Sequence, residues 1–139
     1  MKGGVGKTSL TVNLAWLSAV RSSRRTLLWD LDAQGGASFI LGAPPIAGQA
    51  RDIIARDADP ETRIVRTAVP GLDLLAADAS LRGLDALFAD LERKKRLRRL
   101  VEQLGQTHDR IFLDCPPGLG PTAEQIIRGA SLILVPLIP

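Results

Sequence analysis

Apolar positions in this chain form two kinds of pattern, helical repeats and short uninterrupted runs. Leu10, Leu14 and Leu17 recur at helical spacing, with the small Ala15 near the same face, which predicts a helix over about residues 7–20. A short apolar run bounded by turn residues is typical of a strand buried in a parallel sheet. Runs of this kind predict strands at 26–30, 72–76, 111–114 and 132–136.

The segments between these runs carry helix signals. Ser80 can cap a helix that ends near residue 91, and Gly105 can end a second helix that begins near residue 92. Shorter helical segments are predicted between Gly36 and Gly42, at 52–56 and at 122–128. Strands that alternate with helices imply an α/β fold, in which helices cover both faces of a mostly parallel sheet.

The size and composition of the chain narrow its class. Its 139 residues are enough for one domain with a core of its own, so we predict a single domain over residues 1–139. No apolar run approaches the ~20 residues that a membrane-spanning helix needs, so no membrane segment is expected. A single cysteine excludes an internal disulfide and fits the reducing cytoplasm. The net charge of +3 permits contact with nucleic acid, although the excess is small.

Residues 2–8, KGGVGKT, form a glycine-rich loop that opens the first predicted helix. The backbone N–H groups of such a loop can surround phosphate oxygens. Lys7 would reach the β- and γ-phosphates, and the Thr8 hydroxyl would ligate Mg²⁺. The general pattern G-x-x-x-x-G-K-[ST] is not met, because Met1 stands at its first glycine. A turn that is rich in glycine by chance is the alternative, and the order of these residues disfavours it.

Two carboxylate motifs, WDLDAQG at 29–35 and IFLDCPPG at 111–118, follow the apolar runs of predicted strands. The carboxyl ends of strands in a parallel sheet form the ligand crevice, so both motifs are expected beside the phosphate-binding loop. Asp114 fits the role of holding Mg²⁺ through a water molecule. The Pro-Pro-Gly turn at 116–118 would form a segment that senses the γ-phosphate.

Together these motifs resemble the ParA/MinD family of P-loop ATPases. That family has a deviant Walker-A loop with an extra lysine before the paired glycines, and Lys2 is that lysine here. It also has Asp-x-Asp-Pro-Gln-Gly after one strand and Asp-x-Pro-Pro after another. The chain matches both in order at 30–35 and 114–117, except that Ala33 replaces the usual proline. This departure loosens the turn and removes no functional group.

The resemblance implies a role for each matched residue. Asp32 would position the attacking water, and Asp30 would support the Mg²⁺ and water shell. Lys2 would reach the phosphates of a partner subunit across a nucleotide-sandwich dimer, unless it is only a solvated lysine near the N-terminus. The implied catalytic residues are Lys2, Lys7 and Asp32, and the implied metal residues are Thr8, Asp30 and Asp114. The implied nucleotide-binding residues are Lys2, Gly3, Gly4, Val5, Gly6, Lys7, Thr8 and Ser9.

The family resemblance also implies a function. The chain would bind ATP with Mg²⁺, form a homodimer around it and hydrolyse it as a switch in plasmid or chromosome partition or in cargo positioning. Non-specific DNA and an activator protein would be its partners, and the cytoplasm its location. One alternative is a membrane-cycling ATPase of the MinD type. Another is a non-catalytic fragment or a misplaced reading frame that binds little nucleotide.

Features at both ends of the chain favour the alternative of a fragment or a misplaced reading frame. A phosphate-binding loop normally follows a strand, yet only Met1 precedes Lys2. The resemblance places such a strand inside the sheet, beside residues 111–114. The predicted strand at 132–136 is followed by only three residues. We therefore expect that the first strand and the C-terminal part of the fold are missing from this sequence.

Other features carry less weight. Six basic residues between 93 and 99 lie on a helix with an apolar stripe, and a solvated outer face is favoured over contact with DNA phosphates. Cys115 is expected to be a small buried residue rather than an iron–sulfur ligand. We expect His108 at the surface, and Trp16 and Trp29 in the core.

Overall fold

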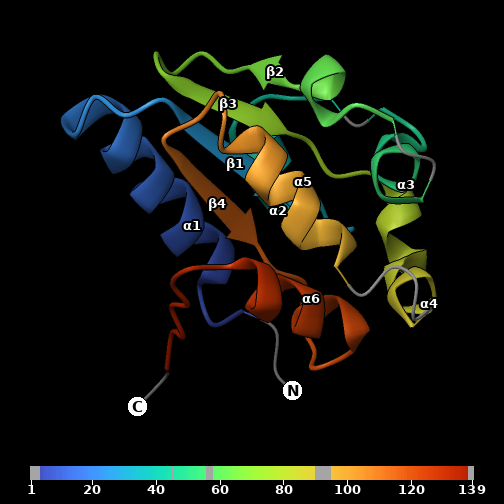
Figure 1. Cartoon of the computed structure of the whole chain (residues 1–139). Coiled ribbons are helices and arrows are strands. Elements are labelled where there is room, and N and C mark those ends of the chain that lie inside the picture. Colours follow the sequence, from blue (N-terminus) through green and yellow to red (C-terminus); the bar gives the residue numbers. More distant parts are fainter. Residues whose placement is uncertain (1–3, 45, 56–57, 90–94, 138–139) are drawn as a thin grey trace.

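The computed structural model describes residues 4–44, 46–55, 58–89 and 95–137 (Figure 1). Its centre is a four-stranded sheet in the order β2-β3-β1-β4. The strands are β1 (Thr26–Asp30), β2 (Val65–Arg66), β3 (Leu72–Leu75) and β4 (Arg110–Asp114). β1 lies between β3 and β4 and runs parallel to both, whereas β2 pairs antiparallel with β3. The prediction of a mostly parallel sheet is therefore confirmed.

Helices cover both faces of this sheet, as the alternating pattern predicted. One face carries α1 (Lys7–Trp16) and α2 (Gly36–Ile40), and the other carries α3 (Gln49–Ala55), α4 (Leu84–Phe88), α5 (Arg96–Leu104) and α6 (Pro121–Gly129). Successive strand residues point to opposite faces, so Leu28 packs with the first set of helices, and Leu27 and Trp29 pack with the second. α6 begins just beyond the carboxyl end of β4 (Figure 1).

The first helix follows its prediction but changes hydrogen bonding near its end. After Trp16 the chain continues as a π-helical segment, Leu17–Arg21. Trp29 in β1 is 1% exposed, as expected, whereas Trp16 is 41% exposed and its predicted place in the core is wrong. The buried side chains of this helical region include the small Ala15 and Ala19. Small side chains let a helix approach the sheet closely, which leaves little room for an indole.

Two polar residues occupy places that the sequence pattern did not predict. The helix expected after Ser80 is capped by Asp78, whose carboxylate accepts a hydrogen bond from the Ser80 N–H at 2.7 Å. A 3-10 turn at Ala79–Gly83 then precedes α4. The expectation that His108 lies at the surface is wrong: it is 7% exposed, and its Nε2 lies 3.0 Å from the Asp73 carboxylate.

The strand predicted at 132–136 is also wrong. Residues 132–137 form no strand, and Leu132, Leu134 and Val135 are 75%, 56% and 71% exposed. An apolar run becomes a strand only where a neighbour satisfies its backbone N–H and C=O groups. No strand in the described part of the chain pairs with this run.

The edges of the sheet bear on the expectation of a missing strand. β4 pairs with β1, and no strand within the described ranges pairs with its other edge. A further strand beside residues 111–114 therefore stays a prediction. None of the helices in the described residues is long and apolar enough to cross a membrane.

Candidate functional site

The glycine-rich loop leads directly into α1. Gly4 has φ 94° and Gly6 has φ 82°, a left-handed conformation that glycine adopts without strain. Gly6 is the N-cap of α1, and Lys7 is its first residue. Two left-handed residues in one short loop turn the chain sharply into the helix. Lys2 and Gly3 lie outside the described residues, so their assigned roles stay predictions.

The N-terminus of α1 is suited to bind an anion. Gly6 makes no side-chain cap, and the first turn contains no acidic residue, so its N–H groups have no capping carboxylate. Unpaired N–H groups and the helix dipole together attract negative charge. Val5, Lys7 and Thr8 are half-buried here, and Ser9 is exposed. The predicted phosphate-binding residues from Gly4 to Ser9 therefore lie together around one helix end.

Asp114 lies at the carboxyl end of β4 and is fully buried. Its Oδ1 accepts a weak hydrogen bond from the Thr11 hydroxyl at 3.4 Å, and its Oδ2 has no hydrogen-bond partner among the described residues. Burial raises the pKa of Asp114, and the neighbouring Thr8 side chain opposes that rise. An unpaired buried carboxylate oxygen is costly, and a cation is the kind of group that would satisfy it. The site therefore fits the Mg²⁺ role assigned to Thr8 and Asp114.

Asp30 lies opposite Asp114 in the register of β1 and β4, and it is equally buried. Its Oδ2 accepts hydrogen bonds from the Ser38 N–H at 2.9 Å and the Ser38 hydroxyl at 2.7 Å, and its Oδ1 accepts one from the Asp32 N–H at 3.2 Å. Burial raises the pKa of Asp30, and the bonds from Ser38 oppose that rise. The Ser38 hydroxyl also accepts a hydrogen bond from the Ala77 N–H at 2.8 Å. Asp30 thus anchors α2 to the sheet, and its predicted role in the Mg²⁺ and water shell stays a prediction.

Sequence reasoning missed Ser38, which completes this anchor. Its signal in the sequence is weak, because a serine eight positions after Asp30 matches no motif in the chain. Gly36, two residues earlier, also supports the site. A Cβ atom there would lie 3.2 Å from the Thr8 methyl group, so a glycine allows α2 to pack closely on the first turn of α1.

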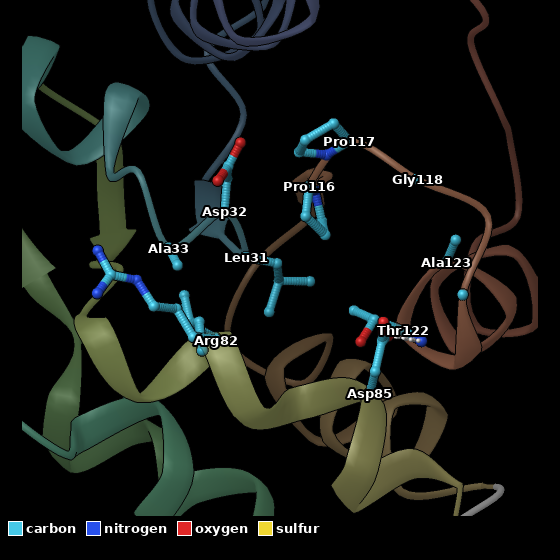
Figure 2. Close-up of a pocket in the computed structure, with 12 residues that line it drawn as sticks. Leu31, Asp32, Ala33, Arg82, Asp85, Pro116, Pro117, Gly118, Thr122 and Ala123 are labelled. Carbon is cyan, nitrogen blue, oxygen red and sulfur yellow. Dashed lines mark hydrogen bonds between the residues drawn. The ribbon is translucent and has the colours of Figure 1, made fainter. Parts of the chain in front are cut away.

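Asp32 lies on a cavity of about 180 Å³ between two loops. Its Oδ1 accepts a hydrogen bond from the Gln34 N–H at 2.9 Å, and its side chain is half-buried. Pro116 and Pro117 form the opposite wall of the cavity (Figure 2). The structure therefore brings Asp32 next to the Pro-Pro-Gly turn, as expected for two segments that act on the same group.

Of the remaining candidates, Cys115 is half-buried and not fully buried as expected, whereas the described part of the basic cluster lies on a solvated face as expected. Burial raises the pKa of the Cys115 thiol to about 11, so the thiol is protonated at neutral pH. In the described part of the basic cluster, Lys95, Arg98 and Arg99 are exposed, and Arg98 pairs with Glu102 at 2.9 Å. The described residues contain no group of three or more His, Cys, Asp or Glu side chains that could hold a metal ion.

Comparison with known proteins places this geometry among nucleotide-binding proteins. Residues 1–139 match the protein family described as AAA domain. The sporulation initiation inhibitor protein Soj of Bacillus subtilis is 36% identical over 140 residues, which cover 98% of this chain and 54% of that protein. The chromosome partitioning protein ParA of Myxococcus xanthus is 34% identical over 139 residues, which cover 98% and 49%.

Solved structures give the same result. The cobyrinic acid a,c-diamide synthase of Mycobacterium smegmatis with a bound ATP analogue and magnesium has a TM-score of 0.87 and 34% identity, covering 98% of this chain and 56% of that one. The septum site-determining protein MinD of Pyrococcus horikoshii, complexed with Mg-ADP, has a TM-score of 0.73 and 26% identity, covering 94% and 51%. The chain thus spans about half the length of the relatives it matches.

Proposed function

Because the chain belongs to the ParA/MinD family of P-loop ATPases, we propose that it binds ATP with Mg²⁺ and hydrolyses it as a dimerisation switch. The switch would serve plasmid or chromosome partition, or the positioning of other cargo. The observation that carries the proposal is the unpaired, buried Oδ2 of Asp114 beside Thr8, at the end of an uncapped helix.

Different residues around the N-terminus of α1 would bind the phosphates and the Mg²⁺ ion. The N–H groups of the loop and the Lys7 ammonium would hold the β- and γ-phosphates, and the Thr8 hydroxyl and Asp114 would hold Mg²⁺. Proteins commonly bind Mg²⁺ through one or two carboxylates together with water and substrate phosphates, so a larger acidic cluster is unnecessary. When bound, Mg²⁺ neutralises part of the charge on the β- and γ-phosphates.

Hydrolysis requires a water molecule in line with the γ-phosphorus. Asp32 accepts a hydrogen bond from that water and orients its oxygen. The water oxygen bonds to phosphorus as the bond to the β–γ bridging oxygen breaks, which yields ADP and phosphate. The Pro-Pro-Gly turn opposite Asp32 would sense the γ-phosphate. Phosphoryl transfer depends mainly on such positioning and on charge neutralisation.

Dimerisation and partners extend the proposal beyond the single chain. Lys2 would contact the phosphates bound by a second copy, and the loop after Asp114 exposes Leu119 to 84%, where a partner surface could cover it. Non-specific DNA and an activator protein are the proposed partners, and the cytoplasm is the proposed location. The names of relatives such as the chromosome partitioning proteins ParA of Myxococcus xanthus and Caulobacter vibrioides support partition.

The proposal is tested by measuring nucleotide binding and turnover with and without Mg²⁺. Lys7→Ala should lose ATP binding, because the Lys7 charge meets the phosphates in the ground state. Asp32→Ala should retain binding and lose hydrolysis, because Asp32 acts on water. Lys95→Ala is the matched control, since it removes an exposed lysine on the far side of the sheet from α1.

Two results would count against the proposal. Equal ATP affinity in wild type and Lys7→Ala would refute the assignment of the phosphate-binding loop. Absence of Mg²⁺-dependent binding in the wild-type chain would favour the non-catalytic alternative.

A further inference from the structure

The loop that follows Asp114 is held at one end by β4 and at the other by the start of α6. This β4–α6 loop, residues 115–120, begins at the carboxyl end of β4 and ends at the N-cap of α6. Its prolines line the cavity that Asp32 faces (Figure 2). Gly118 within it has φ 127°, a conformation that favours glycine. Whatever fixes the α6 end of this loop therefore also fixes the cavity wall opposite Asp32.

A carboxylate from another helix fixes that end. Asp85, in the first turn of α4, accepts a hydrogen bond through Oδ1 from the Thr122 N–H at 3.0 Å. The N-cap residue of α6, Gly120, makes no side-chain cap of its own. Figure 2 shows Asp85 beside Thr122 and Arg82 extending the other way. Asp85 thus caps α6 from outside the helix, where its negative charge is favoured by the helix dipole.

The fit of Gly120 shows how closely the carboxylate approaches. A Cβ atom at Gly120 would lie 2.6 Å from Asp85 Oδ2, a distance that real Cβ contacts do not reach. Gly120 has φ −78°, which any residue can adopt. A side chain at Gly120 would therefore displace the Asp85 carboxylate, although the backbone conformation would tolerate it.

We propose that Asp85 is a positioning residue for ATP hydrolysis: by holding the start of α6, it keeps the β4–α6 loop in place opposite Asp32. This inference rests on the proposed function. Asp85 contacts the end of the loop, and it lies on α4, which packs on the face of the sheet opposite to α1. Its loss should therefore slow turnover and leave ATP affinity unchanged.

Kinetics of three variants test the role. Without the cap, the loop is held less firmly opposite Asp32, so Asp85→Ala should lower kcat about three- to tenfold. The dissociation constant for ATP should stay within about twofold. Asp85→Asn should recover most of the loss, because its amide oxygen can still accept the Thr122 N–H. Glu124→Gln is the matched control: it removes a first-turn carboxylate of α6 that pairs with Arg128, and its kcat should match wild type.

A double-mutant cycle tests the geometry. Gly120→Ala should lower kcat in the wild-type background, because the new methyl group meets the Asp85 carboxylate. In the Asp85→Ala background the same change should cost less than about twofold, because the obstruction is gone. Equal effects of Gly120→Ala in both backgrounds would overturn the proposed contact.

Hydrogen exchange separates this inference from the proposed function. The β4–α6 loop and the start of α6 carry four backbone amides between residues 118 and 122, since residue 121 is proline. In Asp85→Ala these amides should exchange at least threefold faster, while those of β1 keep their wild-type rates. If the wild-type chain hydrolysed no ATP, the proposed function would fail, and exchange would still show whether Asp85 holds the loop. Wild-type exchange in Asp85→Ala would overturn the inference whatever the turnover.

Discussion

The hydroxyl of Ser38 makes the sharpest stability prediction. It donates a hydrogen bond to the buried Asp30 carboxylate at 2.7 Å and accepts one from the Ala77 N–H at 2.8 Å. Ser38 is 3% exposed and Ala77 is 2% exposed, so water cannot easily replace either bond. Ser38→Ala deletes both bonds and changes little else, because the Ser38 N–H still donates to Asp30 at 2.9 Å.

The expected loss is the sum of two effects. A hydrogen bond to a charged group contributes about 1.5–3 kcal/mol, and a buried N–H left without a partner costs about 1–3 kcal/mol. Because Asp30 keeps the bond from the Ser38 N–H, values near the lower ends apply, for a total of about 3 kcal/mol. Domains of this size are stable by only ~5–15 kcal/mol, so the loss would be a large share.

Urea unfolding followed by circular dichroism measures this loss. With a slope of about 2 kcal/mol/M, the midpoint should fall by roughly 1.5 M and the slope should not change. Ser80→Ala is the matched control, since the Ser80 hydroxyl accepts one bond, from the Arg51 N–H at 3.0 Å, at an exposed site. It should cost less than about 1 kcal/mol. Equal losses in the two variants would refute the reasoning about Ser38.

Two further predictions concern charge at the site. Burial raises the pKa of Asp114, so the folded chain binds more protons than the unfolded chain between the ordinary and the raised value, and this contribution to stability falls as pH rises through that window. Asp114→Asn should therefore stabilise the nucleotide-free chain at neutral pH and flatten the pH dependence of its urea midpoint, while removing Mg²⁺-dependent binding. An unchanged pH profile would contradict this. Lys2→Ala should leave nucleotide binding by the single chain intact and reduce ATP-dependent dimerisation and turnover. Sedimentation with a non-hydrolysable ATP analogue would measure the dimer. An undiminished dimer with normal turnover would reject the role of Lys2 across the dimer.

Local patterns predicted the parallel core of the fold well. The apolar runs at β1, β3 and β4 are long enough to identify a strand, and each is bounded by turn residues. The two-residue β2 has no pattern of its own, because it exists only through its pairing with β3. The opposite error occurred at 132–136, where an apolar run lacks a neighbouring strand. Strand formation depends on a pairing partner, and the sequence does not show which partner is within reach.

At the site, too, local motifs predicted which residues lie at the strand ends but not the contacts that hold them. Motif spacing identified Asp30, Asp32 and Asp114 as residues at strand ends, and the structure places all three at one edge of the sheet. Ser38 and Asp85 were missed, because each acts on a backbone N–H far away in the sequence. Such contacts follow from tertiary packing, which no local motif encodes.

The contrast between Asp30 and Asp114 shows what contacts add to position. The two carboxylates face each other in register at the ends of neighbouring strands, and burial raises the pKa of both. Protein N–H and O–H groups bond both oxygens of Asp30, whereas no group in the described part of the chain bonds Oδ2 of Asp114. A carboxylate that the fold already satisfies gains little from a cation, and one that the fold leaves unsatisfied gains much. Magnesium should therefore stabilise the folded chain mainly through Asp114, and Asp30 should contribute chiefly by keeping α2 and Asp32 in place.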